Sequence, residues 1–338
     1  MNRPPEPALI LDYIEAFRRS KAMFTAVRLG VFDELEQQPR TAEHLADRLH
    51  LNASALPRLL DACVALGLLE REGNGYRNAP IAARYLVSTS PDTLSGYIVY
   101  SDQSLYELWS RLGDAVREGT NRWVQVFGGR NALFDFYFRD EVATASFLGG
   151  MHGLGQISSS KVIRAFDLTN FHHLADLGGA TGHLAIAACE AYPNLRASVV
   201  DLAPVIPFAQ KHVAQSSAAD RLETIVGDFF ADPLPAADLY SLGRILHDWS
   251  EDRITLLLAK IFAALPAGGA LLVVEKLLEE DRSGPLAALM QDLNMLVCTD
   301  GKERTLSEYE ALLRNAGFHQ ISAKRTGAPL DAILAIKR

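Results

Sequence analysis

The chain has 338 residues, 49% of them hydrophobic and 22% charged, and a formal net charge of −8. This length predicts two domains of ordinary size, and the composition is that of a soluble globular protein with a sizeable core. The negative charge argues against nonspecific nucleic-acid binding, and the three scattered cysteines argue against a disulfide framework or a zinc site. Neither a signal peptide nor an apolar run of membrane-spanning length is recognisable, so we expect a cytoplasmic protein that binds no membrane.

The N-terminal part is predicted to be mostly helical. Apolar residues recur at helical spacing from Leu9 to Leu29, and further helices are expected to begin near Thr41 and Ser54. A two-stranded hairpin is expected after Gly67, with its turn at Asn74-Gly75.

A helix pair followed by a hairpin is typical of a winged helix, a fold that often reads DNA. Here the second helix of the pair carries a single basic residue, Arg58, whereas a reading helix needs several basic or amide side chains. The sequence therefore favours a dimerisation module over a DNA-binding one.

The stretch between residues 80 and 170 is predicted to be helical and rich in aromatic residues, some of which would wall an apolar substrate pocket. These aromatic residues are Tyr97, Tyr100, Tyr106, Trp109, Trp123, Phe127, Phe134, Phe136, Tyr137, Phe138 and Phe147. Three glycines between Gly150 and Gly155 are unusual inside a helix and indicate either a close approach or a kink.

From about residue 171 strands and helices alternate, which predicts an α/β domain with a mainly parallel sheet. Near its start a short apolar strand leads into a turn containing Gly178, Gly179 and Gly182, and the next strand ends at Asp201. A glycine-rich turn followed about 20 residues later by an acid is typical of a nucleoside-binding βαβ unit, where the acid meets the ribose hydroxyls. Asp176, just before the turn, would repel a pyrophosphate but suits a cationic nucleoside, which favours S-adenosylmethionine over NAD.

Further acids and one histidine are expected at or just beyond the ends of later strands, where open α/β sheets bind ligands. Asp228 is a candidate acceptor for the adenine amino group, with Phe229 against the ring. His247 is a candidate general base for a hydroxyl, and Glu275 and Glu303 are candidate carboxylates beside it.

Five motifs, in this order, resemble those of the plant-type small-molecule O-methyltransferases, and within that family the acetylserotonin O-methyltransferase group. They are Asp176-Leu-Gly-Gly, Gly227-Asp-Phe-Phe, Arg244-Ile-Leu-His-Asp-Trp249, Leu272-Val-Val-Glu275 and Gly301-Lys-Glu-Arg-Thr305. Residues that match the family are most frequent from about residue 166 to the C-terminus.

The resemblance implies an N-terminal winged-helix dimerisation and helical domain over residues 1–165 and a class I, Rossmann-like methyltransferase domain over residues 166–338. It implies a homodimer that uses S-adenosylmethionine and releases S-adenosylhomocysteine. No metal is expected, because the sequence shows no ligand cluster and a histidine base suffices. His247 resembles the family's catalytic base, with Glu275 and Glu303 as its flanking carboxylates. The residues matching cofactor contacts are Gly178, Asp201, Asp228, Phe229 and Arg244, to which we add Asp176.

Asp248 and Asn294 resemble substrate contacts of the acetylserotonin enzymes, but three other positions depart from them. Cys298 stands where those enzymes have a glutamine, and a thiol cannot replace the hydrogen bonds of an amide. By an ungapped count, Gly155 and Phe138 stand where they have a tryptophan and a tyrosine near the cofactor. The acceptor is therefore expected to be a small hydroxylated aromatic, a hydroxyindole or a phenol, without a specific identity.

Three alternatives to methylation are disfavoured by particular residues. A relative that binds the cofactor but acts as a hydroxylase or decarboxylase is disfavoured by the complete set of His247, Glu275 and Glu303. A ligand-sensing winged-helix regulator is disfavoured by the acidic charge and the poor reading helix, and an NAD dehydrogenase by Asp176.

Overall fold

The structure is a computed structural model that describes residues 7–128 and 137–338. The chain divides into two compact units, Met1–Gln103 and Ser104–Arg338. The sequence suggested a boundary at residue 165, which is close to where the sheet of the second unit begins. The helices between residues 104 and 163 belong to the second unit, because they contact α12 and α15 of that unit.

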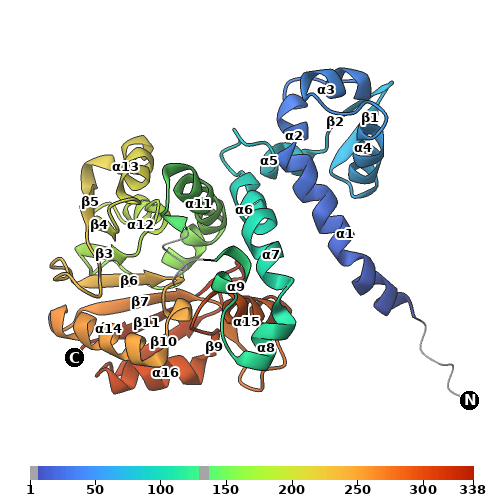
Figure 1. Ribbon diagram of the computed structural model, residues 1–338. Helices are drawn as coiled ribbons and strands as arrows, with labels where there is room; N and C mark the ends of the chain where they lie inside the picture. Colours follow the sequence, from blue (N-terminus) through green and yellow to red (C-terminus); the bar gives the residue numbers. More distant parts are fainter. Residues whose placement is uncertain (1–6, 129–136) are drawn as a thin grey trace, which may run out of the picture. The chain divides into compact units, whose positions relative to one another are not determined.

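The first unit is a small helical body that carries one hairpin (Figure 1). Its elements are α1 (Ala8–Arg28), α2 (Val31–Glu34), α3 (Ala42–Arg48), α4 (Leu56–Ala65), β1 (Leu69–Glu72), β2 (Gly75–Asn78), α5 (Pro80–Tyr85) and α6 (Ser95–Tyr100). The expected helix pair and hairpin are thus present, in the order that is typical of a winged helix.

The hairpin turn lies one residue earlier than the sequence suggested. Glu72 pairs with Gly75, so the turn residues are Gly73 and Asn74. Gly75 is needed in the strand because a Cβ there would lie 2.8 Å from the carbonyl oxygen of Arg40, whose backbone pairs with Tyr76. Close backbone packing therefore explains the second glycine, which the sequence pattern assigned to the turn.

The second unit begins with short helices and one long one. They are α7 (Tyr106–Trp109), α8 (Leu112–Glu118), α9 (Trp123–Phe127) and α11 (Glu141–Ile163), with a π-helical turn, η1 (Ser101–Leu105), leading into them. The glycine segment near residue 150 lies inside α11, which is continuous over its 23 residues. A Cβ at Gly155 would meet the imidazole of His183 on α12, so Gly155 permits close packing of two helices. Of the aromatic residues noted above, Phe134 and Phe136 lie outside the described residues.

A seven-stranded sheet organises the second unit. Its strands are β3 (His173–Leu177), β4 (Arg196–Asp201), β5 (Leu222–Val226), β6 (Leu239–Gly243), β7 (Ala270–Glu275), β10 (Gln320–Lys324) and β11 (Asp331–Ile336). The order across the sheet is β10-β11-β7-β6-β3-β4-β5, in which the strands from β7 to β5 run parallel. The last two strands form an antiparallel hairpin, and β11 inserts antiparallel between β10 and β7.

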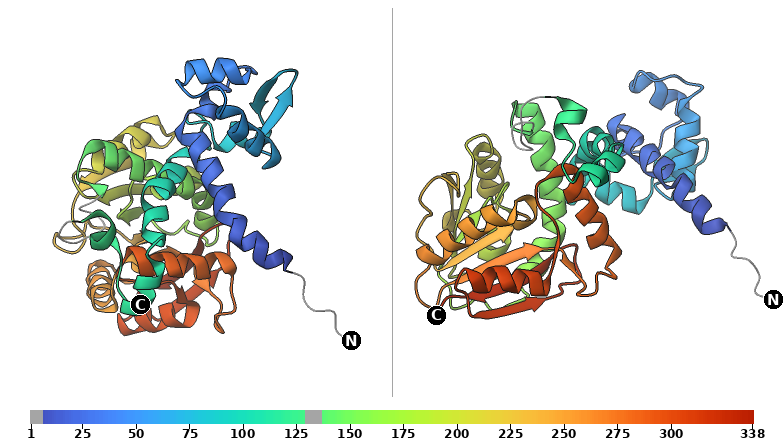
Figure 2. Two further views of the ribbon diagram at one scale, coloured as in Figure 1. Left: turned by 45° about the vertical axis from the view of Figure 1, so that its right-hand side comes forward. Right: turned by 60° about the horizontal axis from the view of Figure 1, so that its bottom comes forward.

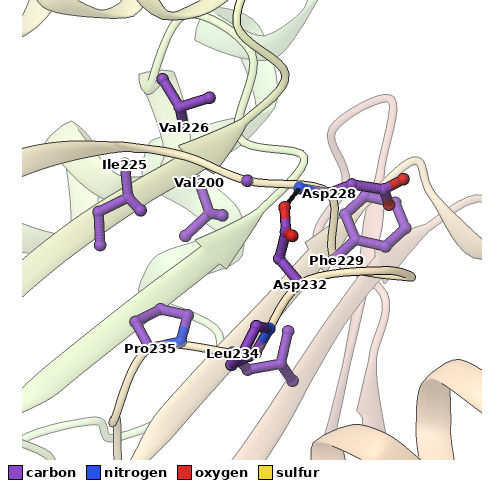
Figure 3. A pocket seen from close by; sticks show the side chains of 10 residues that line it. Val200, Ile225, Val226, Asp228, Phe229, Asp232, Leu234 and Pro235 are labelled. Atoms are coloured by element: carbon purple, nitrogen blue, oxygen red, sulfur yellow. Dashed lines mark hydrogen bonds between the residues drawn. The ribbon is translucent and has the colours of Figure 1, made fainter.

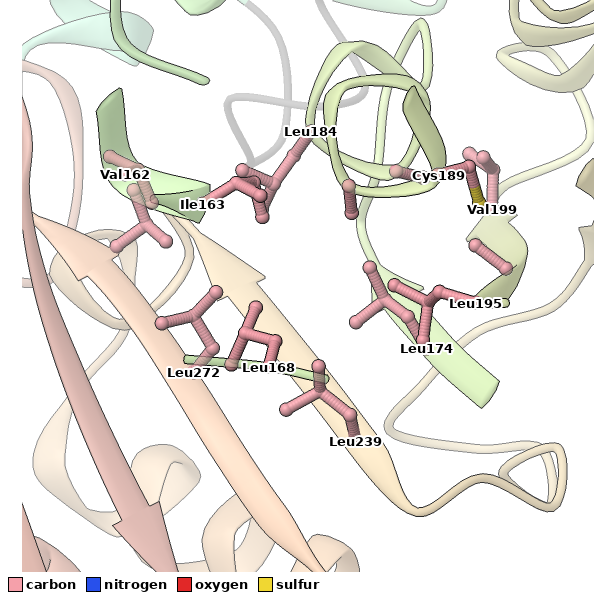
Figure 4. Close-up of a cluster of buried hydrophobic side chains, with 14 of the residues drawn as sticks. Val162, Ile163, Leu168, Leu174, Leu184, Cys189, Leu195, Val199, Leu239 and Leu272 are labelled. Carbon is pink, nitrogen blue, oxygen red and sulfur yellow. The ribbon is translucent and has the colours of Figure 1, made fainter. Parts of the chain in front are cut away.

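Helices cover both faces of this sheet, as the views in Figures 1 and 2 show. Alternate residues of each strand point to opposite faces: Ala270, Leu272 and Val274 of β7 join one buried cluster, and Leu271 and Val273 join the other. The first cluster packs against α11, α12 (His183–Ala191) and α13 (Ile206–Gln215), and Figure 4 shows its central side chains. The second packs against α14 (Glu251–Ala264) and α16 (Leu306–Asn315).

The parallel strands bring their carboxyl ends to one edge of the sheet. The chain order reverses at β3, which lies between β4 and β6, and such a reversal opens a crevice in which α/β proteins bind ligands. Loops after β3, β4, β5, β6 and β7 therefore meet at this edge, together with α15 (Leu286–Cys298) and the short parallel pair β8 (Leu277–Leu278) and β9 (Arg304–Thr305).

Ser250 occupies the N-cap position of α14, but its side chain makes no capping hydrogen bond. The chain instead leaves β6 through a 3₁₀ turn, η3 (Leu246–Asp248), which ends before the helix begins. Among the described residues, we find no helix that combines the length and the apolar character needed to cross a membrane.

Candidate active site

The loop after β3 approaches its surroundings so closely that only glycine fits at two positions. The φ of Gly178 is 69°, and a Cβ there would lie 2.6 Å from Cδ1 of Ile245. A Cβ at Gly179 would lie 2.8 Å from Oδ2 of Asp176. The backbone N–H of Gly178 donates to the carbonyl of Val200 at 2.8 Å, which holds the loop against β4. The two glycines thus let the backbone of the loop pack closely against Ile245 and Asp176.

Asp201, at the end of β4, holds the same loop from the other side. Its Oδ2 accepts a hydrogen bond from the backbone N–H of Ala180 at 2.8 Å, and its Oδ1 accepts one from Leu202 at 2.7 Å. Burial raises the pKa of this carboxyl to about 6. The side chain thus has a structural task that the sequence did not indicate, and each oxygen keeps a lone pair for a ribose hydroxyl.

Asp176 lies beneath the loop, where it is 2% exposed. Its Oδ1 accepts a hydrogen bond from the Ser241 hydroxyl at 2.6 Å, while Oδ2 has no partner among the described residues. Burial is the main cause that raises the pKa of this carboxyl to about 6. A buried carboxylate oxygen without a partner is costly, and a cationic group bound beside it would remove that cost.

A pocket of about 150 Å³ opens beside the end of β5 (Figure 3). Its lining includes apolar side chains such as Val200, Ile225 and Leu234, together with Asp228 and Phe229. The backbone N–H of Asp228 donates to Oδ2 of Asp232 at 2.9 Å, and Oδ1 of Asp228 accepts from the N–H of Phe230. These bonds hold the loop in place and leave Oδ2 of Asp228 as the oxygen for a ligand donor.

His247 lies in η3 and meets two carboxylates from other parts of the chain. Its Nδ1 lies 2.8 Å from Oε1 of Glu303 and 3.4 Å from Oε2 of Glu275. The three residues are between 0% and 3% exposed. Because a carboxylate can only accept, Nδ1 carries the proton and Nε2 is the ring nitrogen left to exchange one. Nε2 lies 3.6 Å from Oδ1 of Asp248.

The charges of this cluster favour a protonated histidine. Burial disfavours the imidazolium, but attraction to Glu275, Glu303 and Asp248 outweighs it and raises the pKa of His247 to about 9. Burial also raises the pKa of Glu275 to about 7. The site therefore stabilises the imidazolium that forms when His247 accepts a proton.

Glu275 also shapes the turn that carries the histidine. Its Oε1 accepts hydrogen bonds from the backbone N–H groups of Ile245 and Leu246, at 3.0 and 2.9 Å. These two N–H groups open the η3 turn, so one carboxylate oxygen anchors the turn while the other faces the imidazole. No local sequence pattern indicates this second task, because it joins residues 29 and 30 positions apart.

Of the candidate substrate-contact positions, Asn294 and Cys298 lie on α15, whereas Asp248 lies in η3. Oδ1 of Asn294 accepts a hydrogen bond from Nε1 of Trp109 at 2.8 Å, and the Cys298 thiol lies 3.7 Å from the same oxygen. Trp123 donates to the carbonyl of Cys298 at 2.6 Å. Burial raises the pKa of Cys298 far above its usual range, so this residue is a neutral thiol. The sequence did not indicate that Trp109 and Trp123 hold these residues in place.

Arg244 adopts a conformation that is uncommon for a side chain larger than glycine. Its φ is 57°, and its backbone N–H donates to the carbonyl of Val274 at 2.9 Å. Its guanidinium makes no hydrogen bond or ion pair within residues 7–128 and 137–338. Strained residues of this kind cluster at functional sites, and the contact of Arg244 with the cofactor stays a prediction.

Comparisons with known proteins identify the family. Residues 109–319 match the O-methyltransferase domain, and residues 11–88 match the O-methyltransferase dimerisation domain. The chain belongs to the O-methyltransferase family. The resemblance read from its motifs is thereby confirmed, as are the α/β fold and the order of the two domains.

Individual relatives support this membership along the whole chain. The chain is 42% identical to acetylserotonin O-methyltransferase of Gallus gallus, over 98% of this chain and 97% of the relative. It is 41% identical to the probable bifunctional dTTP/UTP pyrophosphatase/methyltransferase protein of Homo sapiens, but spans only 54% of that protein's length. The crystal structure of human N-acetylserotonin methyltransferase in complex with SAM matches with a TM-score of 0.93 at 39% identity, covering 100% of this chain and 99% of that chain.

The cofactor of this O-methyltransferase family is S-adenosylmethionine, and the residues of the glycine loop fit it. The unpartnered oxygen of Asp176 suits the positive charge of the molecule, and Asp201 suits its ribose. The pocket beside Asp228 and Phe229 suits its base. Which group each residue contacts stays a prediction.

The cluster of one histidine and two glutamates also has the spacing of a cation site. His247, Glu275 and Glu303 each offer one ligand atom, and these atoms lie within 4.8 Å of one another. A metal would require Nδ1 of His247 to lose the proton that it shares with Glu303. We therefore expect methyl transfer to be unchanged in excess EDTA. Loss of activity in EDTA and its recovery with a divalent cation would contradict this expectation.

Proposed function

We propose that this O-methyltransferase methylates a hydroxyl of a small aromatic acceptor, a hydroxyindole or a phenol, with His247 as the general base. The observation that carries the proposal is the buried contact of His247 with Glu303 and Glu275, beside a loop that fits S-adenosylmethionine. Identity of about 40% to an acetylserotonin O-methyltransferase supports an indole-like acceptor.

When bound, S-adenosylmethionine supplies a methyl group that is already activated for transfer. Nε2 of His247 would take the proton of the acceptor hydroxyl as the oxygen bonds to that methyl group. The bond from the methyl group to the sulfonium sulfur would break at the same time, which leaves neutral S-adenosylhomocysteine. The Nδ1–H of the His247 ring keeps its hydrogen bond to the carboxylate of Glu303, and this negative charge stabilises the imidazolium. Asp248, beside Nε2, helps to orient the acceptor.

The departure at Cys298 supports an acceptor that differs from N-acetylserotonin. Asn294 lies beside Cys298, and its amide oxygen accepts a hydrogen bond from Trp109. The NH₂ group of Asn294 is therefore the part of the amide that would donate a hydrogen bond to the acceptor. A thiol at position 298 adds no strong hydrogen bond for an amide arm.

The experiment is transfer of labelled methyl groups from S-adenosylmethionine to a panel of acceptors. The panel contains hydroxyindoles with and without an N-acetyl group, simple phenols and flavonoids. Label on the hydroxyl of one class is the expected result. Cofactor binding without transfer to any acceptor would contradict the proposal and favour non-methylating chemistry.

The activity is expected to rise with pH, because His247 must lose a proton before it can act as a base. With a pKa of about 9 in the free protein, kcat/KM should increase from neutral pH and level off above about pH 9. The unfolded pKa is near 6.5, so the stability contributed by the His247 charge is fully present below pH 6.5 and is lost as pH rises through 9. A pH–rate profile and melting temperatures from pH 6 to 10 measure both trends. An activity that falls across this range would argue against His247 as the base.

We also infer a homodimer formed through the first unit, as the dimerisation domain suggests. Six large apolar side chains on the first half of α1, between Leu9 and Phe17, are 51% to 65% exposed in the single chain. Exposed apolar patches of this kind mark interaction sites, and a second copy of the chain is the expected partner.

Replacing Ile14 and Phe17 together by glutamate should produce a monomer in multi-angle light scattering. Arg18→Ala changes an exposed neighbour on the same helix and should leave the dimer intact. A wild-type chain that is monomeric at micromolar concentration would refute the inference.

A further inference from the structure

Arg304 is a charged side chain that is almost entirely enclosed in protein. It lies in β9, directly after Glu303, and is 1% exposed. Enclosing a guanidinium costs several kcal/mol unless its donors find acceptors. The partners of Arg304 therefore indicate what the residue is for.

A single nitrogen of Arg304 joins the two segments that carry the base and its carboxylate. Nη1 donates to the carbonyl of Leu246 at 3.2 Å and to the carbonyl of Lys302 at 3.0 Å. Leu246 directly precedes His247, and Lys302 directly precedes Glu303. The guanidinium thus links the backbone beside the imidazole to the backbone beside the carboxylate that holds Nδ1.

The remaining contacts of Arg304 are weak. Nη2 lies 3.9 Å from Oε1 of Glu251, whose side chain is 60% exposed, and Nε has no hydrogen-bond partner in the described part of the chain. The guanidinium carbon lies 5.9 Å from the ring centre of Tyr309. A residue kept only for stability would be expected to use more of its five donors, so the link between the two segments is the main gain.

The same two segments touch at a second point. A Cβ at Gly301 would meet the carbonyl group of His247 and lie 2.8 Å from the backbone nitrogen of Trp249. Backbone contact at Gly301 and the guanidinium at Arg304 therefore lie on either side of Glu303. Because both contacts hold this segment against the His247 turn, the distance between the Glu303 carboxylate and Nδ1 of His247 can vary little.

We propose that Arg304 is a positioning residue for methyl transfer, which holds the His247 turn against the Glu303 segment so that the imidazole keeps its orientation. The inference rests on the proposed role of His247 as the base. Arg304 is enclosed in protein and acts through the backbone of Leu246 and Lys302. Lysine cannot take its place, because an ammonium on a flexible stem lacks the planar arrangement of donors.

The test compares Arg304→Lys with Arg282→Lys. Arg282 is half-exposed and pairs with Glu308, and it contacts neither the His247 turn nor Glu303. For both variants we would measure the melting temperature, the Kd for S-adenosylmethionine, kcat, the acceptor KM and the pH dependence of kcat. The downfield proton resonance of His247 Nδ1–H reports directly on its bond to Glu303.

We expect Arg304→Lys to fold and to bind S-adenosylmethionine like the wild type, but to lose about 10²-fold in kcat, the cost of a displacement of about 1 Å. The midpoint of its pH profile and the Nδ1–H resonance should both move. Arg282→Lys should change none of these quantities.

Two results would overturn the inference. One is a folded Arg304→Lys protein with wild-type kcat, pH profile and Nδ1–H resonance. The other is loss of the melting transition in Arg304→Lys, and also in Arg304→Met, because Arg304 would then serve folding alone. His247→Ala, assayed in parallel, separates the two hypotheses: if it keeps wild-type kcat, the proposed base is wrong whatever Arg304 does.

Discussion

Replacing His247 by alanine should lower kcat by about 10² to 10⁴-fold, the range for loss of a general base. The acceptor hydroxyl would then have to lose its proton without Nε2, and the imidazolium that Glu303 and Glu275 stabilise could not form. The Kd for S-adenosylmethionine should stay close to that of the wild type, because the glycine loop, Asp176 and Asp201 remain in place. Single-turnover transfer of labelled methyl groups, together with calorimetric titration of the cofactor, measures both effects.

His172→Ala is the matched control for this substitution. His172 also faces a carboxylate, with its Nδ1 3.2 Å from Oδ2 of Asp238, but its side chain is 83% exposed. Its removal should leave kcat unchanged. A His247→Ala protein that binds the cofactor and transfers methyl groups at the wild-type rate would exclude His247 as the base.

Gly301→Ala should impair the site although it adds a single methyl group. The new Cβ would meet the carbonyl oxygen of His247 and lie 2.7 Å from its carbonyl carbon, and backbone atoms cannot rotate away as a side chain can. The Glu303 segment must therefore move away from the His247 turn. We expect a loss of about 10²-fold in kcat from the misplaced carboxylate and of about 1–3 kcal/mol in stability from overpacking.

Gly113→Ala is a comparison in which the same substitution is expected to raise the stability of the protein. Gly113 lies in α8, and a Cβ at this position would have the end of the Arg117 side chain as its nearest neighbour, at 3.7 Å. Alanine should stabilise this helix by about 0.5–1 kcal/mol and leave kcat unchanged. Denaturant unfolding and steady-state kinetics measured on both variants test the pair. Wild-type kcat in Gly301→Ala would show that the two segments tolerate separation.

Much of the cofactor side of the site could be predicted because its signals are local. Gly178 and Gly179 fall in one turn, and Asp176 and Asp201 end two successive strands of one βαβ unit. A glycine in the sequence indicates a position where the backbone adopts positive φ, as at Gly178. An acid at the end of a parallel strand must lie at the edge of the sheet where ligands bind. The helix from Ala8 to Arg28 was likewise predictable from apolar residues at helical spacing. The strand from Ala270 to Glu275 was predictable from a short continuous run of apolar residues, because both patterns depend on neighbouring residues.

The sequence by itself thus determined the element types, the glycine loop, the acids at the strand ends and the family. Only the tertiary structure decided how the base is held. His247, Glu275 and Glu303 lie up to 56 residues apart, and they meet because β6 and β7 are neighbours and the Glu303 segment packs against the η3 turn. No pattern among neighbouring residues indicates three other features. They are the anchoring of that turn by Glu275, the insertion of β11 between β7 and β10, and the link made by Arg304. Each feature depends on which distant backbone groups the fold brings within hydrogen-bonding distance. The spacing of residues along the chain does not indicate which groups these are.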